Sequence, residues 1–396
     1  MKIKQNKKII PYSRQFIDRE DIGSIKQILK SQFLTQGPQV EKFENNLKKI
    51  SGSKYAVAAN SATSCLILAC LALGIKKNDL VWTSSNTFVS TANSAVHCGA
   101  IIDLIDIDLE TGNISINALK KKLLYAKKIN NLPKVVITVH FGGQPTDQEE
   151  IWKLSKKYKF KIIEDASHSI GAKHKGEKVG SCRWSELTIM SFHPVKPITS
   201  GEGGVALTNK KKYAYKMQLL RTHGIEKNLN TKITNQFGNW YYEQRLLGFN
   251  FRLSDIHAAL GISQLKKLKY FNSKRKQIVK RYNLIFEGNK NIIPLKINKE
   301  NFSSHHLYVI RIVSKKKNIR NNLIKFLKTK KVTLNVHYIP VHYHPYYKKF
   351  KIDKNSLKNS EKYFHQALSL PLYVGLKKKD QINVAKHIEN FINNYK

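Results

Sequence analysis

The chain has 396 residues, of which 41% are hydrophobic, and it carries a formal net charge of +43. This length exceeds the usual size of a single hydrophobic core, so we expect one large and one smaller domain. The most apolar run, 65–75, is about half of the roughly 20 residues that a membrane span needs, which excludes a transmembrane helix. The basic start, 1–8, leads into Pro11 and not into the apolar run of a signal peptide, so we expect a cytoplasmic protein with no membrane partner.

The high positive charge raises the question of nucleic-acid binding, because a basic surface attracts polyanions. Lysine is spread over the whole chain, and its runs fall where helix ends and loops are expected, at 120–122, 210–212, 315–317 and 377–379. These runs are not interleaved with aromatic residues, as they are in a platform on which bases stack. We therefore favour a solvated surface over a nucleic-acid interface.

Cysteine and histidine give no metal-binding pattern. The four cysteines form no C-x-x-C pair and have no zinc-type spacing, so we interpret them as reduced, buried thiols. They are Cys65, Cys70, Cys98 and Cys182. A cluster of His337, His342 and His344 could ligate a metal, but we favour a structural or substrate-facing role and predict no metal.

Helix and strand signals alternate through the first 253 residues. Apolar residues at helical spacing predict a helix at 18–30, and further helices are expected from the turn at 60–63 to residue 73 and at 148–158. The expected strands are 55–59, 80–83, 100–105, 135–139, 161–163, 187–191 and 205–208. Several are nearly continuous apolar runs, which are typical of strands inside parallel sheets. The alternation predicts an α/β fold, with a mostly parallel mixed sheet flanked by helices.

The character of the sequence changes after residue 253. A long helical region is expected at 254–286, followed by a mixed segment with strands near 307–313 and 333–338. We therefore predict a large domain at 1–253, which includes the N-terminal segment, and a smaller α+β domain at 254–396.

Lys196 differs from the other lysines in the residues that surround it in the sequence. Lys196 follows the strand expected at 187–191, lies between Pro194 and Pro197, and precedes the small residues of 200–204. A lysine that forms an imine must be held in position and must lose its proton readily, which a rigid, buried loop provides. On spacing alone, we favour an ordinary surface lysine, because a motif built on a single lysine is not specific.

Two further segments carry polar groups at places where ligands bind. Glu164 and Asp165 come at the end of the strand expected at 161–163, and open α/β sheets bind ligands at such ends. A carboxylate there can pair with a protonated pyridine nitrogen, or it can simply cap a helix. The segment 60–64, Asn-Ser-Ala-Thr-Ser, opens a helix whose free N–H groups suit a phosphate, although an ordinary N-cap has the same composition.

Taken in order, these segments resemble one known family. Over almost its whole length the chain resembles the DegT-type sugar aminotransferases, which have the fold-type-I architecture of pyridoxal-phosphate (PLP) enzymes. The resemblance is carried by Phe-Leu-Thr-Gln-Gly-Pro at 33–38, Asn-Ser-Ala-Thr at 60–63, Glu-Asp-Ala-Ser-His at 164–168, the Lys196 loop, Gly-Phe-Asn-Phe-Arg-Leu-Ser-Asp at 248–255 and His-Tyr-Ile-Pro at 337–340.

The resemblance implies a PLP-dependent transaminase and assigns roles around its ring. Lys196 would hold the cofactor as a Schiff base, and Asp165 would pair with the pyridine nitrogen. His168 would lie near the O3′ side of the ring, and Phe88 would stack on its face. Phe88 could instead be a core aromatic residue.

The resemblance also implies how the cofactor phosphate is held. Ala62, Thr63 and Ser191 would bind it from the same chain. Asn250 resembles an asparagine that reaches the phosphate from the other subunit, which implies a homodimer with shared active sites. Asn250 could instead be a turn residue.

Within the family, the position of Lys196 argues against the dehydratase branch, which has histidine there. The amino-acid sequences of the segments 10–15, 191–199 and 336–341 most resemble those of the branch that acts in pseudaminic acid biosynthesis. That branch implies amino transfer from L-glutamate to C4 of a UDP-linked 2-acetamido-2,6-dideoxy-hexos-4-ulose, with sugar contacts expected from Tyr12, His337 and Tyr338. The alternatives are a transaminase for another nucleotide-linked 3- or 4-keto-deoxysugar, a dehydratase or regulator of the same fold, and a basic nucleic-acid-binding protein on a retained PLP fold.

Overall fold

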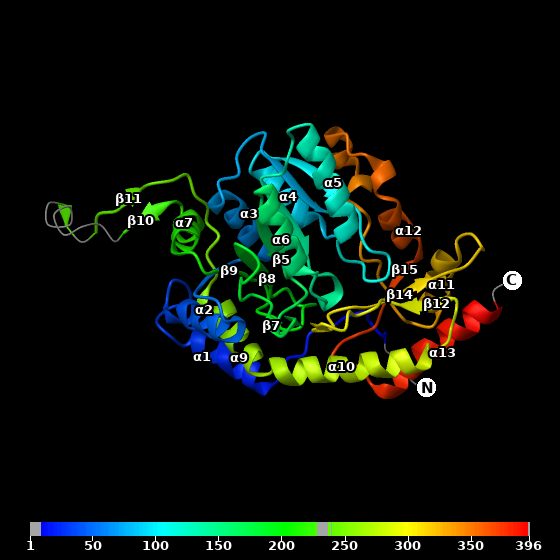
Figure 1. Cartoon of the computed structure of the whole chain (residues 1–396). Helices are drawn as coiled ribbons and strands as arrows, with labels where there is room; N and C mark the ends of the chain where they lie inside the picture. Colours follow the sequence, from blue (N-terminus) through cyan, green and yellow to red (C-terminus); the bar gives the residue numbers. More distant parts are fainter. Residues whose placement is uncertain (1–8, 228–236, 239, 395–396) are drawn as a thin grey trace.

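The structure is a computed structural model that describes residues 9–227, 237–238 and 240–394 (Figure 1). The basic opening segment, 1–8, lies outside the described residues. No helix in the described ranges is long and apolar enough to span a bilayer.

A seven-stranded sheet forms the centre of the larger part of the molecule. In spatial order it consists of β1 (Tyr55–Ala59), β9 (Gly204–Thr208), β8 (Leu187–Ser191), β5 (Lys161–Asp165), β4 (Val135–Val139), β2 (Leu80–Ser84) and β3 (Ile101–Ile105). Neighbours from β8 to β3 are parallel, whereas β9 is antiparallel to both β8 and β1. The predicted mostly parallel, mixed sheet is therefore confirmed.

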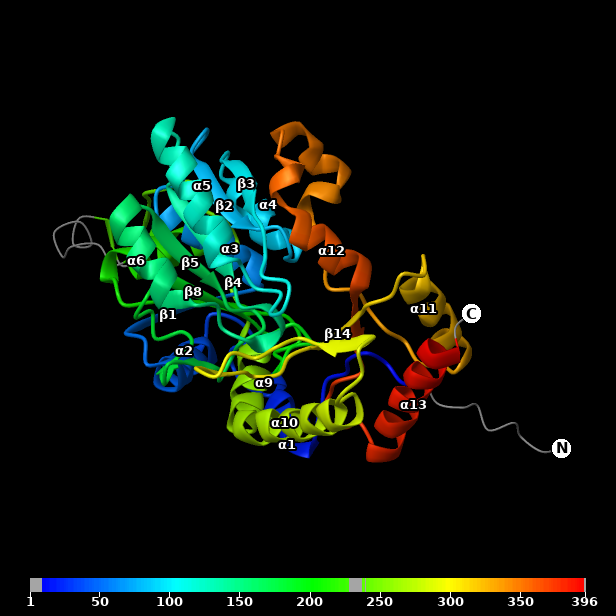
Figure 2. The same cartoon turned by 45° about the vertical axis from the view of Figure 1, so that its right-hand side comes forward.

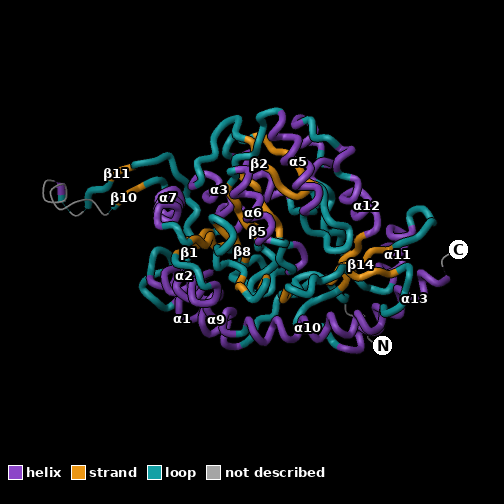
Figure 3. Tube along the Cα trace, in the orientation of Figure 1, coloured by secondary structure: helices purple, strands orange, loops and turns teal. Residues whose placement is uncertain are grey.

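Helices cover both faces of this sheet (Figures 1 and 3). They are α1 (Arg19–Leu29), α2 (Pro38–Ser51), α3 (Ala62–Ala72), α4 (Val89–His97), α5 (Ile116–Lys128), α6 (Gln148–Tyr158), α7 (Lys211–Arg221) and α9 (Asp255–Lys266). Successive side chains of a strand point to opposite faces. Val135 and Ile137 accordingly share a core with α3, α4 and α7, whereas Val136 shares one with α5 and α6. The α/β class follows from this alternation.

A three-stranded antiparallel sheet forms the centre of the smaller part. Its order is β12 (Ile292–Pro294), β14 (Tyr308–Ile312) and β15 (Ala367–Leu370). α10 (Leu268–Ile285), α11 (Ile319–Thr329) and α13 (Lys378–Asn394) pack on it in one core, and α12 (Lys358–Gln366) precedes β15. Figure 2 shows α11 and α13 on the side remote from the large sheet. The start of the chain joins this part, since Ile10 bridges Val332.

The remaining elements are short. β6 (Lys173–His174), β7 (Glu177–Lys178) and β13 (Asn301–Phe302) form a small sheet, and turns of 3-10 helix occur at η1 (Phe141–Gly143), η2 (Val341–Tyr343), η3 (Pro345–Phe350) and η4 (Lys354–Ser356). β10 (Ile225–Glu226) and β11 (Glu243–Gln244) pair in a hairpin that projects beyond α7, at the left of Figure 1.

One expectation for the segment after residue 253 is confirmed and one is wrong. The region 254–286 is helical, as predicted, and consists of two helices, α9 and α10, which meet at Lys267. The segment 333–338 is not a strand, because it meets the outer edge of β15 with only a single bridge, from Asn335 to Ser369. The division of the chain at 253 stays a prediction; α9, which follows it, packs on α1 and α2.

Candidate active site

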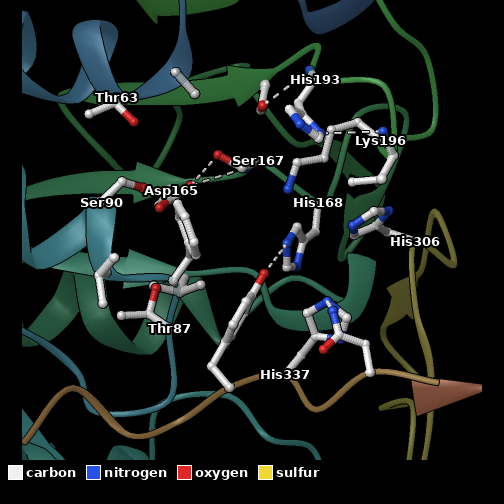
Figure 4. Close-up of a pocket in the computed structure, with 18 of the residues that line it drawn as sticks. Thr63, Thr87, Ser90, Asp165, Ser167, His168, His193, Lys196, His306 and His337 are labelled. Carbon is white, nitrogen blue, oxygen red and sulfur yellow. Dashed lines mark hydrogen bonds between the residues drawn. The ribbon is translucent and has the colours of Figure 1, made fainter. Parts of the chain in front are cut away.

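A cavity of about 550 Å³ opens at the carboxyl ends of β5 and β8, where the segment 335–339 of the smaller part covers it (Figure 4). Of the site residues expected from the sequence, these line it: Tyr12, Ala62, Thr63, Phe88, Asp165, His168, Ser191, Lys196, His337 and Tyr338. Asn250 does not line it; this residue is exposed and bridges Thr222. The sequence motifs therefore converge on one cavity, with Asn250 outside it.

Lys196 projects into the cavity from a tightly bonded loop. The amide of Lys196 donates to the carbonyl of His193 over 2.9 Å, and the amide of Ser200 donates to the carbonyl of Phe192 over 3.0 Å. Burial lowers the pKa of Lys196 to about 8, against a smaller opposing effect of the Asp165 charge. The amine is therefore held in place and loses its proton far more readily than a surface lysine does.

Asp165 ends β5 and is fixed by hydroxyl groups. One carboxylate oxygen accepts a hydrogen bond from Thr91 over 2.6 Å, and the other accepts from the hydroxyl of Ser167 over 2.6 Å. Thr91 lies on α4 and is bonded in turn to Thr87 over 2.7 Å. The carboxylate is nearly buried, so its orientation is set by α4 and by the turn after β5.

His168 and Tyr338 form a hydrogen-bonded pair in the cavity wall. The amide of Gly142 donates to Nδ1 of His168 over 3.2 Å, and Nε2 lies 3.0 Å from the hydroxyl oxygen of Tyr338. Burial, aided by the charge of Lys196, holds the pKa of His168 well below its usual range. A neutral His168 whose Nδ1 accepts therefore carries its proton on Nε2, directed at Tyr338.

His337 is held in the wall by two partners. Its Nδ1 lies 2.7 Å from the hydroxyl of Ser369, and its Nε2 lies 3.4 Å from Nδ2 of Asn335. Burial lowers the pKa of His337 to about 3. The ring of Tyr12 packs against it, with the centroids 5.5 Å apart. Both ring nitrogens of His337 thus have protein partners already.

The start of α3 forms the opposite end of the cavity. Ser61 caps this helix by accepting from the amide of Ser64 over 3.1 Å, which leaves the amides of Ala62 and Thr63 in the first turn. A Cβ atom on Gly204 would lie 2.4 Å from the nitrogen of Ala62, so only glycine allows β9 to approach the helix this closely. Free first-turn amides at a helix N-terminus bind anions.

Sequence reasoning missed several residues of the cavity wall. Ser90 and Ser167 were detectable, since each lies two residues after an expected site residue, and both are labelled in Figure 4. Asn335 lay in a segment expected to be a strand. His306 gave no signal, because it precedes the apolar run of β14 and looks like a core residue.

His342 and the four cysteines do not line this cavity, whereas His193, His306 and His344 do. Within the described residues, no group of three or more His, Cys, Asp or Glu side chains could hold a metal ion. His342, from the cluster noted in the sequence, bonds to Glu361 over 3.2 Å. All four cysteines are free thiols; three are buried, and Cys98 is half-buried.

The residues present fit the cofactor that the resemblance implies. PLP carries an aldehyde, a ring nitrogen that ionises and a phosphate, and it needs an amine, a carboxylate and an anion site placed around one cavity. Lys196 supplies an amine with a lowered pKa, Asp165 an anchored carboxylate, and the start of α3 an anion site.

Known proteins match the chain over almost its whole length. Residues 15–389 match the family model that is described as the DegT/DnrJ/EryC1/StrS aminotransferase family. A UDP-4-amino-4,6-dideoxy-N-acetyl-beta-L-altrosamine transaminase of Campylobacter jejuni is 39% identical over 374 residues, 94% of each chain. The Helicobacter pylori aminotransferase PseC, involved in the biosynthesis of pseudoaminic acid, has a TM-score of 0.89 and 31% identity, covering 98% of this chain and 100% of its own.

The PLP-form of a sugar aminotransferase from Streptococcus pneumoniae, Spr1654, has a TM-score of 0.88 and 26% identity, covering 98% of this chain and 99% of its own. This match accords with the fit of PLP to the cavity, and the family matches agree on sugar amination. The chain therefore belongs to the DegT/DnrJ/EryC1/StrS aminotransferase family, as a sugar aminotransferase that uses pyridoxal phosphate.

Proposed function

We propose that this chain transfers the amino group of L-glutamate to C4 of a UDP-linked 2-acetamido-2,6-dideoxy-hexos-4-ulose, a step of pseudaminic acid biosynthesis. One observation carries the proposal. Relatives that are named for this product, at 31% to 39% identity, match almost the whole chain, and a lysine stands where the amine of a transaminase must be.

Four side chains hold the cofactor ring in this proposal. Lys196 binds the cofactor covalently through Nζ, and Asp165 pairs with the ring nitrogen. The exposed ring of Phe88 covers one face, and His168 lies on the O3′ side. Since Tyr338 accepts from Nε2 of His168, the orientation of that imidazole is fixed before any ligand arrives.

The start of α3 and Ser191 would hold the cofactor phosphate. The amides of Ala62 and Thr63 point from the first turn, and Ser191 ends β8 at the same side of the sheet. A phosphate there gains hydrogen bonds from groups that otherwise lack intrahelical partners.

Lys196 also moves the protons. When bound, the cofactor supplies an electron sink next to the donor's α-carbon. The amine of the donor would take the place of Lys196 on the cofactor, and the freed Nζ of Lys196 would then take the proton from that carbon in the first half-reaction and give a proton to C4 of the sugar in the second. The lowered pKa of Lys196 suits both tasks, because proton transfer is most efficient when the pKa lies near the working pH. Glutamate leaves as 2-oxoglutarate, and the sugar ketone becomes an amine.

The sugar is contacted by Tyr12, His337 and Tyr338 in this proposal. All three line the cavity from the side of the smaller part and the N-terminal segment. Because both nitrogens of His337 are bonded to Ser369 and Asn335, we expect its ring face rather than its nitrogens to meet the sugar.

The decisive experiment is amino transfer from glutamate labelled with a heavy nitrogen isotope. Purified protein with PLP is given a panel of UDP- and dTDP-linked 4-keto and 3-keto sugars, and the products are analysed by mass. We expect the label in the UDP-linked 4-keto 2-acetamido sugar, and no label with Lys196→Ala. Labelling of only a dTDP-linked or 3-keto sugar would assign a different sugar transaminase, and loss of water from the sugar would assign a dehydratase.

A further inference from the structure

His306 is a buried imidazole in the cavity wall that the roles above leave unused. It lines the cavity beside His168, with their ring centroids 4.3 Å apart, and Figure 4 shows it on the same side as Lys196. Only 3% of its surface is exposed, yet its Nδ1 has no hydrogen-bond partner among the described residues. A buried polar group without a partner is unfavourable, so a partner that arrives with a ligand is the natural explanation.

The backbone of His306 is held rigidly. Its carbonyl accepts from the guanidinium of Arg275 over 3.2 Å, and Arg275 is itself buried on α10. On the other side the chain packs on Gly143, where an added Cβ would lie 2.8 Å from the nitrogen of His306. The imidazole is therefore placed by two parts of the molecule and not by chance.

The surroundings of His306 attract a negative charge. Burial, with smaller effects of the neighbouring His168, Lys196, Arg275 and His337, holds the pKa of His306 well below its usual range. Of these neighbours, Lys196 and Arg275 carry the positive charge, whereas His168 and His337 are neutral. Within the described residues no carboxylate is paired with the His306 side chain, and Asp165 is held by Thr91 and Ser167. The remaining acid of the wall, Glu202, is exposed and pairs with His193 at 3.9 Å.

Among the described residues that this chain itself contributes to the wall, there is no arginine to bind a carboxylate. The residues that line it with basic side chains are Lys196, His168, His193, His306, His337 and His344. Lys196 is committed to the cofactor, and His168 and His337 are bonded through both ring nitrogens. An amino-acid donor brings at least one carboxylate to this cavity, and the buried imidazole still without a partner is His306.

We propose that His306 determines the specificity for the amino donor by binding one of its carboxylates. This inference rests on the proposed function only in taking the donor to be an amino acid such as glutamate. A carboxylate beside the imidazole favours the protonated ring, which reverses the effect of burial. Donor binding is therefore accompanied by uptake of a proton at His306, and the resulting charge-assisted hydrogen bond replaces the missing partner.

The test measures binding of glutarate, which has both carboxylates of glutamate but no amino group and cannot react. Calorimetry of the holoenzyme in buffers of different ionisation enthalpy gives the dissociation constant and the number of protons taken up. We expect glutarate to bind about tenfold or more weakly to His306→Gln than to the wild type, with close to one proton fewer taken up.

Two further variants make the result specific. His306→Asn places an amide near the position of Nδ1, whereas His306→Gln places an amide near that of Nε2. The variant that retains more affinity for glutarate therefore identifies the nitrogen that binds the carboxylate. If His306→Gln does not fold, His306→Asn replaces it in the binding test. The matched control is His342→Gln, which removes an equally buried imidazole outside the cavity and should bind glutarate like the wild type.

Steady-state kinetics distinguish an effect on binding of the amino donor from an effect on binding of the sugar acceptor. We expect His306→Gln to raise the KM for glutamate about tenfold or more while the KM for the nucleotide sugar stays within about twofold. Unchanged glutarate binding with unchanged proton uptake in both His306 variants, or a rise confined to the sugar KM, overturns the inference. Absence of glutarate binding by the wild type overturns it as well, whereas failure of the sugar panel contradicts only the acceptor proposed above.

Discussion

At the scale of single residues, the site depends on two side chains of opposite charge, Lys196 and Asp165. Burial lowers the pKa of Lys196 while the charge of Asp165 opposes that effect, so the carboxylate limits how far the amine is driven toward its neutral form. Thr91 and Ser167 in turn fix Asp165. Lys196 and Asp165 therefore serve as a site only together with the residues that hold them. For this reason the sequence of the lysine loop alone did not identify the site.

We predict that Asp165→Asn lowers kcat by a factor of about 10² to 10⁴ while some cofactor stays bound. The amide is neutral and cannot stabilise a protonated ring nitrogen, although it is nearly the same size. Steady-state kinetics and the absorbance of the bound cofactor check this. Asp103→Asn, which removes a carboxylate paired with Lys122 on the surface, serves as control and should leave kcat unchanged. Full activity in Asp165→Asn would assign the ring nitrogen to another partner.

The pKa of Lys196 gives a second prediction at this scale. Because burial lowers this pKa from the ordinary 10.5 to about 8, the amine is charged below pH 8 and neutral above it. Only the neutral amine attacks an aldehyde, so in cofactor-free protein the rate of PLP recombination should rise about tenfold per pH unit below 8 and level off above it. Stopped-flow absorbance measures this rate; a rate that still rises up to pH 10 would show an ordinary lysine.

At the scale of elements, the sequence predicted what depends on local patterns. The strands of the large sheet were found because their apolar runs are buried on both faces, and α6 was found with its bounds because its apolar spacing is regular. The strand prediction for 333–338 was wrong because the pairing of this segment depends on β15, which is distant in the sequence and bridges it only at Asn335. His306 was missed for the same reason: its contacts with Arg275 and His168 come from elsewhere in the chain.

The contact between β9 and α3 leads to a prediction for one glycine. In Gly204→Ala the new Cβ would lie 2.4 Å from the backbone nitrogen of Ala62, so the start of α3 must move. We expect loss of PLP affinity by about tenfold or more together with a lower Tm, since displaced amides bind phosphate less well. The control is Gly375→Ala, where a Cβ would meet only a side-chain atom of Tyr373 at 4.0 Å. Cofactor titration by fluorescence and thermal unfolding test both variants, and unchanged affinity in Gly204→Ala would contradict the phosphate role.

At the scale of the whole molecule, several large apolar side chains remain exposed. Leu247 is 88% exposed and Trp240 is 76% exposed near the projecting hairpin, and Ile22 and Leu29 on α1 are each about 60% exposed. We expect side chains as exposed as Leu247 and Trp240 to contact another copy of the chain in the dimer. Asn250 lies just after Leu247 and outside the cavity of its own chain, which supports the proposal that a second copy of the chain completes each site.

A mixing experiment tests this shared site directly. Lys196→Ala and Asn250→Ala should each be inactive or strongly impaired alone. If Asn250 serves the partner's cavity, a dimer of one copy of each variant has one site with both substitutions and one with neither. Random reassociation of equal amounts then makes about half the dimers mixed, so about a quarter of all sites are intact. We expect activity to recover to about a quarter of the wild-type value after the subunits are dissociated and reassociated together. If Asn250 served its own chain, no mixed dimer would hold an intact site, and activity would stay at the level of the separate variants.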